Sequence, residues 1–508
     1  MNFDYVIIQS GGKGTRLYPL TKNKPKAIVD VNNRPIIFHL FEQFKDKKFI
    51  IIGDYKYKEL SRYLEQYAGV RYLLIHSTQH GNVAGIKEAL NFIPENKAFM
   101  LIWSDLLLDN NINFKSLEEG SYIGITNKFI CSWQFTENKL LQKISSINNG
   151  VAGMFLFSNK SVIPDLPEEG SFTKYLANKE IDLKTLDLLD TKEVGSLDAI
   201  RKVDKSNENR CRPYNKMTFS ENKVRKDGLT EEGRQLIGRE VQWYKRVVEC
   251  GFTKIPKIYS YEPLVMSKID GENIFKSKLD NEQKKQVIDN IVFSLNELHS
   301  FDKCTGNVFD MQEDYYAKTM KRIRGIRDVI PFSNEPYIDI NGKKCKNVLF
   351  FYDEFQENVK KIFNNKSFGI IHGDCTFTNT MIDTEGHIYF IDARGYFGKT
   401  DLVGDPDYDW AKVYYSIAGR FDQFNIKNFE LTISEKDVKF NIGPSEWEHL
   451  AEYFFNRIQD CNIYRIKFIH AIIWLSLASH CWEDYDSLCL AFYNGLYLLN
   501  ELEDGNND

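Results

Sequence analysis

The chain lacks a strong charge of either sign. Its 508 residues contain 66 Lys and Arg against 71 Asp and Glu, so the formal net charge is −5. Nucleic-acid-binding proteins usually present a basic face or stripe, and this balance therefore argues against nucleic acid as a partner. Hydrophobic residues at 43% and charged residues at 27% are typical of a globular protein. A chain of this length is predicted to divide into two or three domains.

Long hydrophobic runs and paired cysteines are also missing. The longest apolar stretch, residues 468–482, contains His470 and His480. It is shorter than the ~18 residues of a membrane span, so we expect a buried helix and no membrane insertion. The nine cysteines include no C-x-x-C pair, which argues against structural zinc and favours a reducing compartment. The N-terminus has neither a basic region nor a cleavage site, so a cytoplasmic location is expected.

The first two hundred residues alternate short apolar runs with helical segments. Strands are expected at 5–8, 49–52, 71–75 and 98–103, and helices at 35–45, 58–67 and 83–92. Strand runs of this length between helices indicate an α/β, Rossmann-like domain with a mostly parallel sheet. In such sheets ligands bind at the carboxyl ends of the strands.

The chain changes character after the polar segment at 206–211, which is the predicted linker. The first domain is expected at 1–205 and the second at 212–508. Within the second domain, residues 212–270 are predicted to form a small β-rich lobe with one helix at 233–250. Residues 271–508 are predicted to form a mainly helical lobe that contains one hairpin-like strand pair, at 381–382 and 389–391.

The first phosphate-binding signature is a glycine-rich loop at 11–16 (GGKGTR), which follows a strand and precedes Pro25 and Lys26. Backbone N–H groups of such a loop close on anionic oxygens, and basic side chains neutralise a triphosphate. The loop is not a Walker A motif because Gly14 follows Lys13, and Leu17 stands where a dinucleotide fingerprint has its third glycine. The loop residues expected to bind nucleotide are Gly11, Gly12, Gly14 and Thr15.

Together with residues 79–85, 103–105, 150–155 and 193–196, this loop resembles the sugar-phosphate nucleotidyltransferases, a family that includes glucose-1-phosphate thymidylyltransferases and phosphocholine cytidylyltransferases. The resemblance covers residues 3–203. It implies in-line attack of a substrate phosphate on the α-phosphorus of a nucleoside triphosphate, with release of pyrophosphate.

The same resemblance assigns roles to individual residues. It implies that Arg16 and Lys26 are the catalytic residues at the triphosphate. Asp105 and Glu193 are implied as Mg²⁺ ligands, although a strand cap for Asp105 and a surface role for Glu193 stay open. The residues implied at the nucleotide base are Gln79 and Gly81.

The second signature is His372-Gly373-Asp374, followed by Asn379 and Asp392. The spacing from Asp374 to Asn379 matches a kinase catalytic loop, in which the aspartate accepts the proton of the attacking hydroxyl. The asparagine of such a loop binds one Mg²⁺. Asp392, at the end of an apolar strand, is placed to bind the other.

This region resembles the aminoglycoside phosphotransferase and choline kinase-like family over residues 212–500, including the stretch 404–409 (GDPDYD). HGD in place of HRD, and no Ala-Pro-Glu element after Asp392, disfavour a protein kinase. The resemblance implies a two-lobed, protein-kinase-like fold in which residues 266–271 form the hinge that contacts adenine. It also implies that Asp405 and Asp409 help to fix the catalytic loop and the helix that follows.

A lysine of the small lobe is expected to bind the ATP phosphates. By resemblance this lysine is Lys226, which would pair with Glu240 on the following helix. Lys223, on the same predicted strand, is the alternative.

These two signatures together predict a bifunctional Mg²⁺-dependent transferase. The second domain would phosphorylate a small alcohol (a polyol, a sugar or choline) with ATP. The first would transfer a nucleotidyl group, with CTP as the first choice of nucleotide, to give an activated precursor of a surface polysaccharide. Two domains with separate substrates, or one domain that binds nucleotide and regulates the other, are the alternatives. Whether the chain forms a homo-oligomer stays open.

A choline acceptor would call for an aromatic cage. The aromatic residues available for such a cage, or for a plain hydrophobic core, are Trp410, Tyr414, Tyr415, Trp474 and Trp482.

Overall fold

The structure, a computed structural model, describes residues 1–79, 81–205, 215–363 and 367–504. Its contacts divide the chain into two compact units. The first contains residues 1–208 and 482–486, and the second contains residues 209–481 and 487–508. The linker predicted at 206–211 lies outside the described residues.

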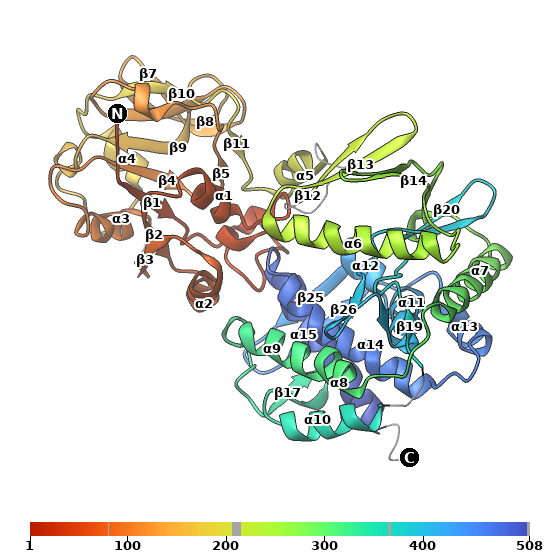
Figure 1. The fold of residues 1–508 in the computed structure, drawn as a ribbon. Coiled ribbons are helices and arrows are strands. Elements are labelled where there is room, and N and C mark those ends of the chain that lie inside the picture. Colours follow the sequence, from red (N-terminus) through yellow and green to blue (C-terminus); the bar gives the residue numbers. More distant parts are fainter. Residues whose placement is uncertain (80, 206–214, 364–366, 505–508) are drawn as a thin grey trace. The chain divides into compact units, whose positions relative to one another are not determined.

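The first unit is built on a sheet with the strand order β10-β6-β9-β4-β1-β2-β3 (Figure 1). The central strands β4, β1, β2 and β3 run parallel, as predicted, whereas β9 runs antiparallel to both β4 and β6. A hairpin of β7 (Cys131–Thr136) and β8 (Lys139–Ser146) extends from β9. The strands of the main order are β1 (Tyr5–Gln9), β2 (Lys48–Gly53), β3 (Arg71–His76), β4 (Phe99–Trp103), β6 (Tyr122–Thr126), β9 (Gly150–Phe157) and β10 (Lys184–Asp187).

Amphipathic helices pack on this sheet. Val83, Ile86 and Leu90 follow the three- and four-residue spacing of a helix face and pack in one core with Ile7 and Ile52 of the central strands. Because β1, β2 and β4 are buried along nearly their whole length, they consist of continuous apolar runs and do not alternate. The helices are α1 (Ile36–Gln43), α2 (Tyr57–Tyr67), α3 (Val83–Leu90), α4 (Phe172–Ala177) and α5 (Leu197–Lys205).

The second unit begins with the predicted β-rich lobe. Its antiparallel sheet has the order β12-β13-β15-β14, and helix α6 (Glu231–Glu249) contacts β13 (Figure 1). Thr230 caps α6 by accepting a hydrogen bond from the Gly233 amide. The strands are β12 (Asn215–Phe219), β13 (Lys223–Gly228), β14 (Ile258–Tyr261) and β15 (Leu264–Ser267).

The remainder of the second unit is rich in helices. The predicted strand pair is present as β20 (Thr380–Asp383) and β21 (Ile388–Phe390), and β16 (Gly271–Asn273) pairs with β20. The helix expected over 468–482 ends at Leu477 and continues as one 3-10 turn, Ala478–His480. The helices are α7 (Asn281–Ser300), α8 (Val308–Met311), α9 (Lys318–Gly325), α10 (Tyr352–Lys361), α11 (Pro406–Ile417), α12 (Phe421–Asn425), α13 (Ala451–Arg457), α14 (Ile463–Leu477) and α15 (Tyr485–Asp504).

The sequence-based prediction missed a four-stranded sheet in this helical part. Its order is β18-β17-β26-β25, formed by β17 (Tyr337–Ile340), β18 (Lys343–Lys346), β25 (Phe429–Ile433) and β26 (Val438–Ile442). Asn341 and Gly342 connect β17 to β18, with φ of 53° and 81°. An Asn-Gly pair with both φ values positive is the usual two-residue hairpin turn, so the signal was present in the sequence.

Helices of the described part of the chain were also compared with the length and hydropathy of a membrane span. None of them is both long enough and apolar enough to cross a bilayer.

Candidate active sites

The first candidate site lies where strand β4 ends beside the glycine-rich loop. Lys26 Nζ is 2.8 Å from Asp105 Oδ2, and Arg16 Nη2 is 2.8 Å from Glu193 Oε1. Asp105 follows β4 directly, and Glu193 is brought beside it because β5 (Leu106–Leu107) pairs with β11 (Lys192–Glu193). The fold therefore unites four of the predicted residues from widely separated parts of the sequence.

Gly14 lets the loop approach the lysine of this site. Its φ is +61°, and a Cβ there would lie 2.9 Å from Lys26 Cβ. The Thr21 hydroxyl donates to the Gly14 carbonyl oxygen at 3.1 Å, which fixes the loop. Lys13 and Arg16 are exposed, whereas Lys26 is largely buried, with 14% of its side chain exposed. The loop thus presents exposed cations, and the largely buried Lys26 lies behind it beside Asp105.

Gly195 marks the point where the acidic and basic side chains converge. A Cβ on Gly195 would clash with Glu193 Oε1, and would lie 2.7 Å from Asp105 Oδ2 and 2.9 Å from Arg16 Nη2. Asp105 and Glu193 therefore face one small space, and carboxylate oxygens are the ligands that Mg²⁺ prefers. The arrangement fits a Mg²⁺ held by these two residues. The sequence analysis did not single out Gly195.

The residues predicted at the nucleotide base lie at the amino end of α3. Gly81 forms a bridge with Gly170, and the Asn82 amide donates to the Gly170 carbonyl oxygen at 2.9 Å. Gln79 is exposed and borders a cavity of about 300 Å³ that is also lined by His76 and Lys87. Gly81 thus has a packing role as well, because its backbone meets that of Gly170 closely.

The second candidate site contains a buried lysine between two carboxylates. Lys226 Nζ lies 2.6 Å from Glu240 Oε2 and 2.5 Å from Asp392 Oδ1. Burial opposes the charge on Lys226, but Asp392 and Glu240 outweigh it and raise the pKa of the lysine. Burial raises the pKa of Glu240 to about 7, against the opposing effect of Lys226.

The alternative lysine lies on the other face of the strand. Lys226 and Val224 are buried, whereas Lys223 and Arg225 are exposed, because side chains alternate along β13. Lys223 Nζ lies 4.6 Å from the ring centroid of Tyr259. The structure therefore brings Lys226 to Glu240, and it does not bring Lys223 there.

The catalytic-loop aspartate is held from two sides. Asn379 Nδ2 donates to Asp374 Oδ2 at 2.8 Å, and Lys412 Nζ lies 2.8 Å from Asp374 Oδ1. The sequence analysis missed Lys412. It lies on α11 three residues after Asp409, and residues at that spacing share a helix face. Because Asp409 was already predicted to support this loop, its spacing to Lys412 could have indicated that Lys412 also faces the loop.

Asp409 fixes the backbone of the loop. Its two carboxylate oxygens accept the amides of His372 at 2.9 Å and Gly373 at 2.7 Å. The His372 ring accepts the Asp374 amide at Nδ1 and lies 3.0 Å from the Ile391 carbonyl oxygen at Nε2. Burial lowers the pKa of His372, so the neutral ring with its proton on Nε2 satisfies both contacts. Asp409 is thus a support for the loop in this structure.

The other predicted supporting acid, Asp405, anchors α11, the helix that follows the loop. Asp405 caps α11 through the Asp407 amide, and both acids form buried ion pairs with Arg465.

Three of the five aromatic residues considered for a choline cage lie in the hydrophobic core. Trp410, Tyr415 and Trp474 are at most 3% exposed and form core contacts, and Trp482 belongs to the first unit.

A Mg²⁺ at the second site would bind to Asn379 and Asp392, as the resemblance implies. Both offer the hard oxygen ligands that this cation requires. Asp392 adopts a left-handed backbone conformation (φ 59°) at the end of β21, which turns its carboxylate toward Lys226. These residues therefore fit the ion.

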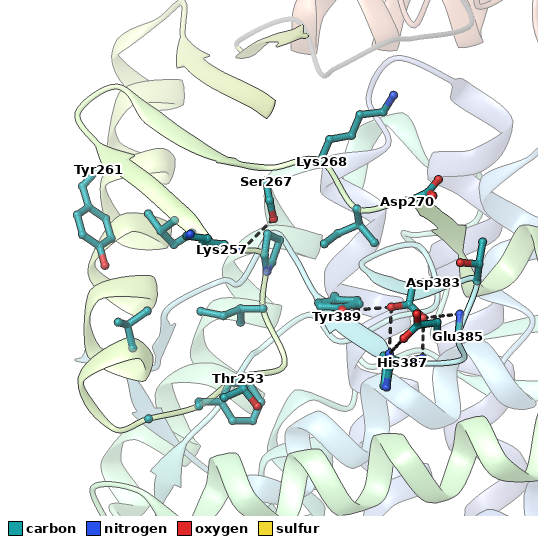
Figure 2. Close-up of a pocket in the computed structure, with 18 residues that line it drawn as sticks. Thr253, Lys257, Tyr261, Ser267, Lys268, Asp270, Asp383, Glu385, His387 and Tyr389 are labelled. Carbon is teal, nitrogen blue, oxygen red and sulfur yellow. Dashed lines mark hydrogen bonds and ion pairs between the residues drawn. The ribbon is translucent and has the colours of Figure 1, made fainter. Parts of the chain in front are cut away.

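One cavity of the second unit borders the predicted hinge and not the catalytic loop. Its volume is about 930 Å³, and its lining includes Ser267, Lys268 and Asp270 of the hinge. Figure 2 shows the other wall, where Tyr389 and His387 approach the Asp383 carboxylate at the turn of the β20–β21 hairpin. Neither Lys226 nor Asp374 lines this cavity, so the cavity lies apart from the residues of the second candidate site.

Comparisons with known proteins agree with this division. Residues 5–118 match the family model of nucleotidyl transferases, and residues 225–426 match that of the phosphotransferase enzyme family. The chain thus matches one of these family models in each unit. The predicted bifunctional family resemblance and the predicted fold class are thereby confirmed.

Two curated relatives each match about a third of this chain or less. UTP–glucose-1-phosphate uridylyltransferase AglF of Haloferax volcanii is 34% identical over 113 residues, which are 21% of this chain and 45% of that protein. D-glycero-alpha-D-manno-heptose 1-phosphate guanylyltransferase of Campylobacter jejuni is 27% identical over 201 residues, which are 35% of this chain and 87% of that protein. The chain thus spans less than half of the length of AglF, and 26% of the length of a GlmU bifunctional protein of Methanococcus maripaludis.

Solved structures also match part of this chain. The inositol-1-phosphate CTP transferase from T. maritima has a TM-score of 0.34 at 17% identity and covers 41% of this chain and 98% of its own. The CTP:phosphocholine cytidylyltransferase LicC from Streptococcus pneumoniae has a TM-score of 0.33 at 22% identity and covers 40% of this chain and 99% of its own.

Proposed function

We propose that the chain is a bifunctional transferase that runs two consecutive reactions on one small molecule. The second unit phosphorylates an alcohol with ATP, and the first unit joins a nucleotidyl group to the new phosphate. The observation that supports this most is that each unit places a lysine against a carboxylate at a phosphate-binding motif: Lys26 with Asp105, and Lys226 with Asp392.

In the first reaction Asp374 accepts the proton of the acceptor hydroxyl, and the oxygen of that hydroxyl attacks the γ-phosphorus of ATP. The bond from that phosphorus to the ADP oxygen breaks. Lys226 binds the ATP phosphates and is held in place by Glu240, whose contact at 2.6 Å leaves the ammonium little freedom. Mg²⁺ at Asn379 and Asp392 would neutralise charge on the phosphates.

In the second reaction the phosphate of the phosphorylated alcohol attacks the α-phosphorus of a nucleoside triphosphate, and pyrophosphate leaves. Arg16 and Lys26 stabilise the charge that develops on the phosphates, and no covalent nucleophile is needed. We propose CTP as the nucleotide because kinase and cytidylyltransferase pairings activate choline and polyols. The product would be a nucleoside-diphosphate-linked precursor of a surface polysaccharide, made in the cytoplasm.

Phosphorus NMR on two variants tests the assignment of one reaction to each unit. Asp374→Ala is expected to lower the rate of alcohol phosphorylation by about 10²–10⁴-fold. The same variant should retain nucleotidyl transfer to a ready-made alcohol phosphate. Asp105→Ala is expected to do the reverse. All four nucleoside triphosphates are supplied, so the preferred base is measured in the same experiment. Loss of both activities in either variant would point to one composite site and contradict the proposal.

A further inference from the structure

The side of Asp374 that carries Lys412 is unusually rich in cations. The ring of Tyr408 on α11, only 7% exposed, is approached by three of them. Arg394 Cζ lies 5.3 Å from the ring centroid, Lys318 Nζ 5.9 Å and Lys412 Nζ 6.0 Å. One phenol ring stabilises a cation by ~0.5–2 kcal/mol, so it does not neutralise three.

The carboxylates at this place are too few to balance the charge. Asp314, whose side chain is 1% exposed, pairs with Lys318 at 2.5 Å and with Arg394 at 2.6 Å. Asp374 pairs with Lys412 at 2.8 Å. Arg322, on α9 one turn after Lys318, donates to the neutral hydroxyl of Ser476 at 2.6 Å. Four cations thus accompany two carboxylates, an excess of two positive charges.

The next acids along α11 remove only part of this excess. Asp405 and Asp407 share one buried cation, Arg465, so together they leave a single negative charge over. The cations also destabilise one another: burial, and then the charge of Arg394, lower the pKa of Lys318 well below its ordinary value. Burial likewise lowers the pKa of Arg322. An anion that enters this place would gain from charges that the protein has already desolvated.

We propose that the alcohol phosphorylated at Asp374 carries an anionic group, a carboxylate or a phosphate, and that Arg322, Arg394 and Lys318 bind it. The inference rests on the proposed kinase function and narrows its acceptor. Lys412 connects the cluster to Asp374, so an acceptor anchored there by its anion presents a hydroxyl to the catalytic aspartate. A quaternary ammonium acceptor such as choline would meet repulsion.

Arg322 is the residue that tests this most cleanly. Arg322 donates to the neutral hydroxyl of Ser476, so its removal leaves no buried carboxylate unpaired, unlike the removal of Arg394. Arg324 is a matched control on the same helix: it is exposed, and its Cζ lies 5.5 Å from the ring centroid of Tyr352. Arg322→Gln and Arg324→Gln therefore remove the same charge two residues apart.

ADP release by the full-length protein is measured with glycerol, choline, glycerate and glycerol 3-phosphate. One of the two anionic acceptors is expected to exceed glycerol and choline by about 100-fold in kcat/KM, and comparing the two anions separates a carboxylate site from a phosphate site. Arg322→Gln is expected to raise the KM for that acceptor by ~10–100-fold with little change in kcat or in the KM for ATP. Arg322→Lys restores most of the loss, and Arg324→Gln behaves as the wild type.

Calorimetry on the protein loaded with a non-hydrolysable ATP analogue separates the two claims. Binding of glycerate or glycerol 3-phosphate that weakens at least ~10-fold in Arg322→Gln supports the anion site, even if no alcohol is phosphorylated and the kinase function fails. If glycerol or choline is the better substrate, the kinase function stands and the anionic acceptor is wrong. No binding of either anion, or a rise in the KM for ATP in Arg322→Gln, would also overturn the inference.

Discussion

The two candidate sites differ in how deeply their charged side chains are buried. In the first unit the Arg16 side chain is 66% exposed, and only Lys26 with Asp105 is withdrawn from solvent. In the second unit Lys226 and Glu240 are 9% and 4% exposed, and Asp409 is fully buried under the catalytic loop. The first site thus combines an exposed loop with one ion pair withdrawn from solvent. The second combines the buried Lys226 and Glu240 with Asp392 and Asp374, whose side chains are 46% and 37% exposed.

This difference has a physical consequence for specificity and stability. An exposed ion pair contributes at most about 1 kcal/mol, so the loop of the first unit is free to rearrange around a triphosphate. A buried charge must be paired, so each member of the second network depends on its partners. We therefore expect substitutions in the second site to act on both activity and stability, and substitutions in the first site to act mainly on activity.

The largest effect is expected at the lysine of the buried network. Lys226→Met removes the ATP-binding cation and should lower kcat/KM for ATP by about 10²–10³-fold, while nucleotidyl transfer to a ready-made phosphate is retained. Lys223→Met, on the exposed face of the same strand, is the matched control and should retain kinase activity. Steady-state ADP release measures both. The reverse order of the two variants would restore Lys223 as the ATP lysine.

A smaller effect is expected at Gly195, where acidic and basic side chains of the first site converge. Gly195→Ala places a methyl group against Asp105 Oδ2 and Arg16 Nη2, and these flexible side chains must move away. We expect nucleotidyl transfer to fall by ~10–100-fold, because shifts of about an ångström at a reacting centre have effects of this order. Pyrophosphate release measures it, and the thermal midpoint should change little.

The matched control for that substitution is Gly238→Ala on α6, where a Cβ would meet nothing within 4 Å. It should leave nucleotidyl transfer unchanged. Full activity in Gly195→Ala would show that the convergence of acidic and basic side chains at Gly195 has no role in the reaction.

The smallest effect concerns a buried acid of the second unit. Burial raises the pKa of Asp422 to about 7, and one carboxylate oxygen has no hydrogen-bond partner. The folded state therefore holds a proton that the unfolded state releases near pH 4. The contribution of Asp422 to stability is therefore fully present below pH ~4 and is lost as the pH rises from there through about 7. At pH 8, Asp422→Asn should stabilise the second unit by on the order of 1–4 kcal/mol.

Calorimetric unfolding between pH 5 and pH 8 measures this prediction. The gain from Asp422→Asn should be larger at pH 8 than at pH 5, whereas the exposed Asp401→Asn should change stability by less than about 0.5 kcal/mol at either pH. An equal effect of Asp422→Asn at both pH values would show that the buried carboxyl does not titrate in this range.

Much of the fold follows from local patterns in the sequence. Apolar runs such as 49–52 become β2, and helical spacing at 83–92 becomes α3, because in both cases the pattern matches the surface that is buried. The sheet formed by β17 and β26 was missed because its short strands pair over a long sequence separation, although Asn341 and Gly342 marked one turn. Local signals state where a strand turns, but not with which strand it pairs.

The candidate sites show the same limit. Asp374 was predicted because the chemistry requires an aspartate and an asparagine at a fixed spacing, and Lys226 was predicted from the family resemblance, with Lys223 as the alternative. Lys412 and Arg322 were not found, because no motif contains them and only tertiary packing brings Lys412 to Asp374 and Arg322 to Ser476. The proposed acceptor chemistry therefore depends on tertiary structure, whereas the reaction type was evident from the sequence.

The most direct test of consecutive reactions follows the phosphorus atoms. The full-length protein is supplied with ATP labelled at the γ-phosphate, CTP labelled at the α-phosphate with a second isotope, and an alcohol that it phosphorylates. The account predicts one product that contains both labels in equal amounts, with ADP and pyrophosphate released. A phosphorylated alcohol that accumulates with the first label alone, in the presence of each nucleoside triphosphate in turn, would contradict it.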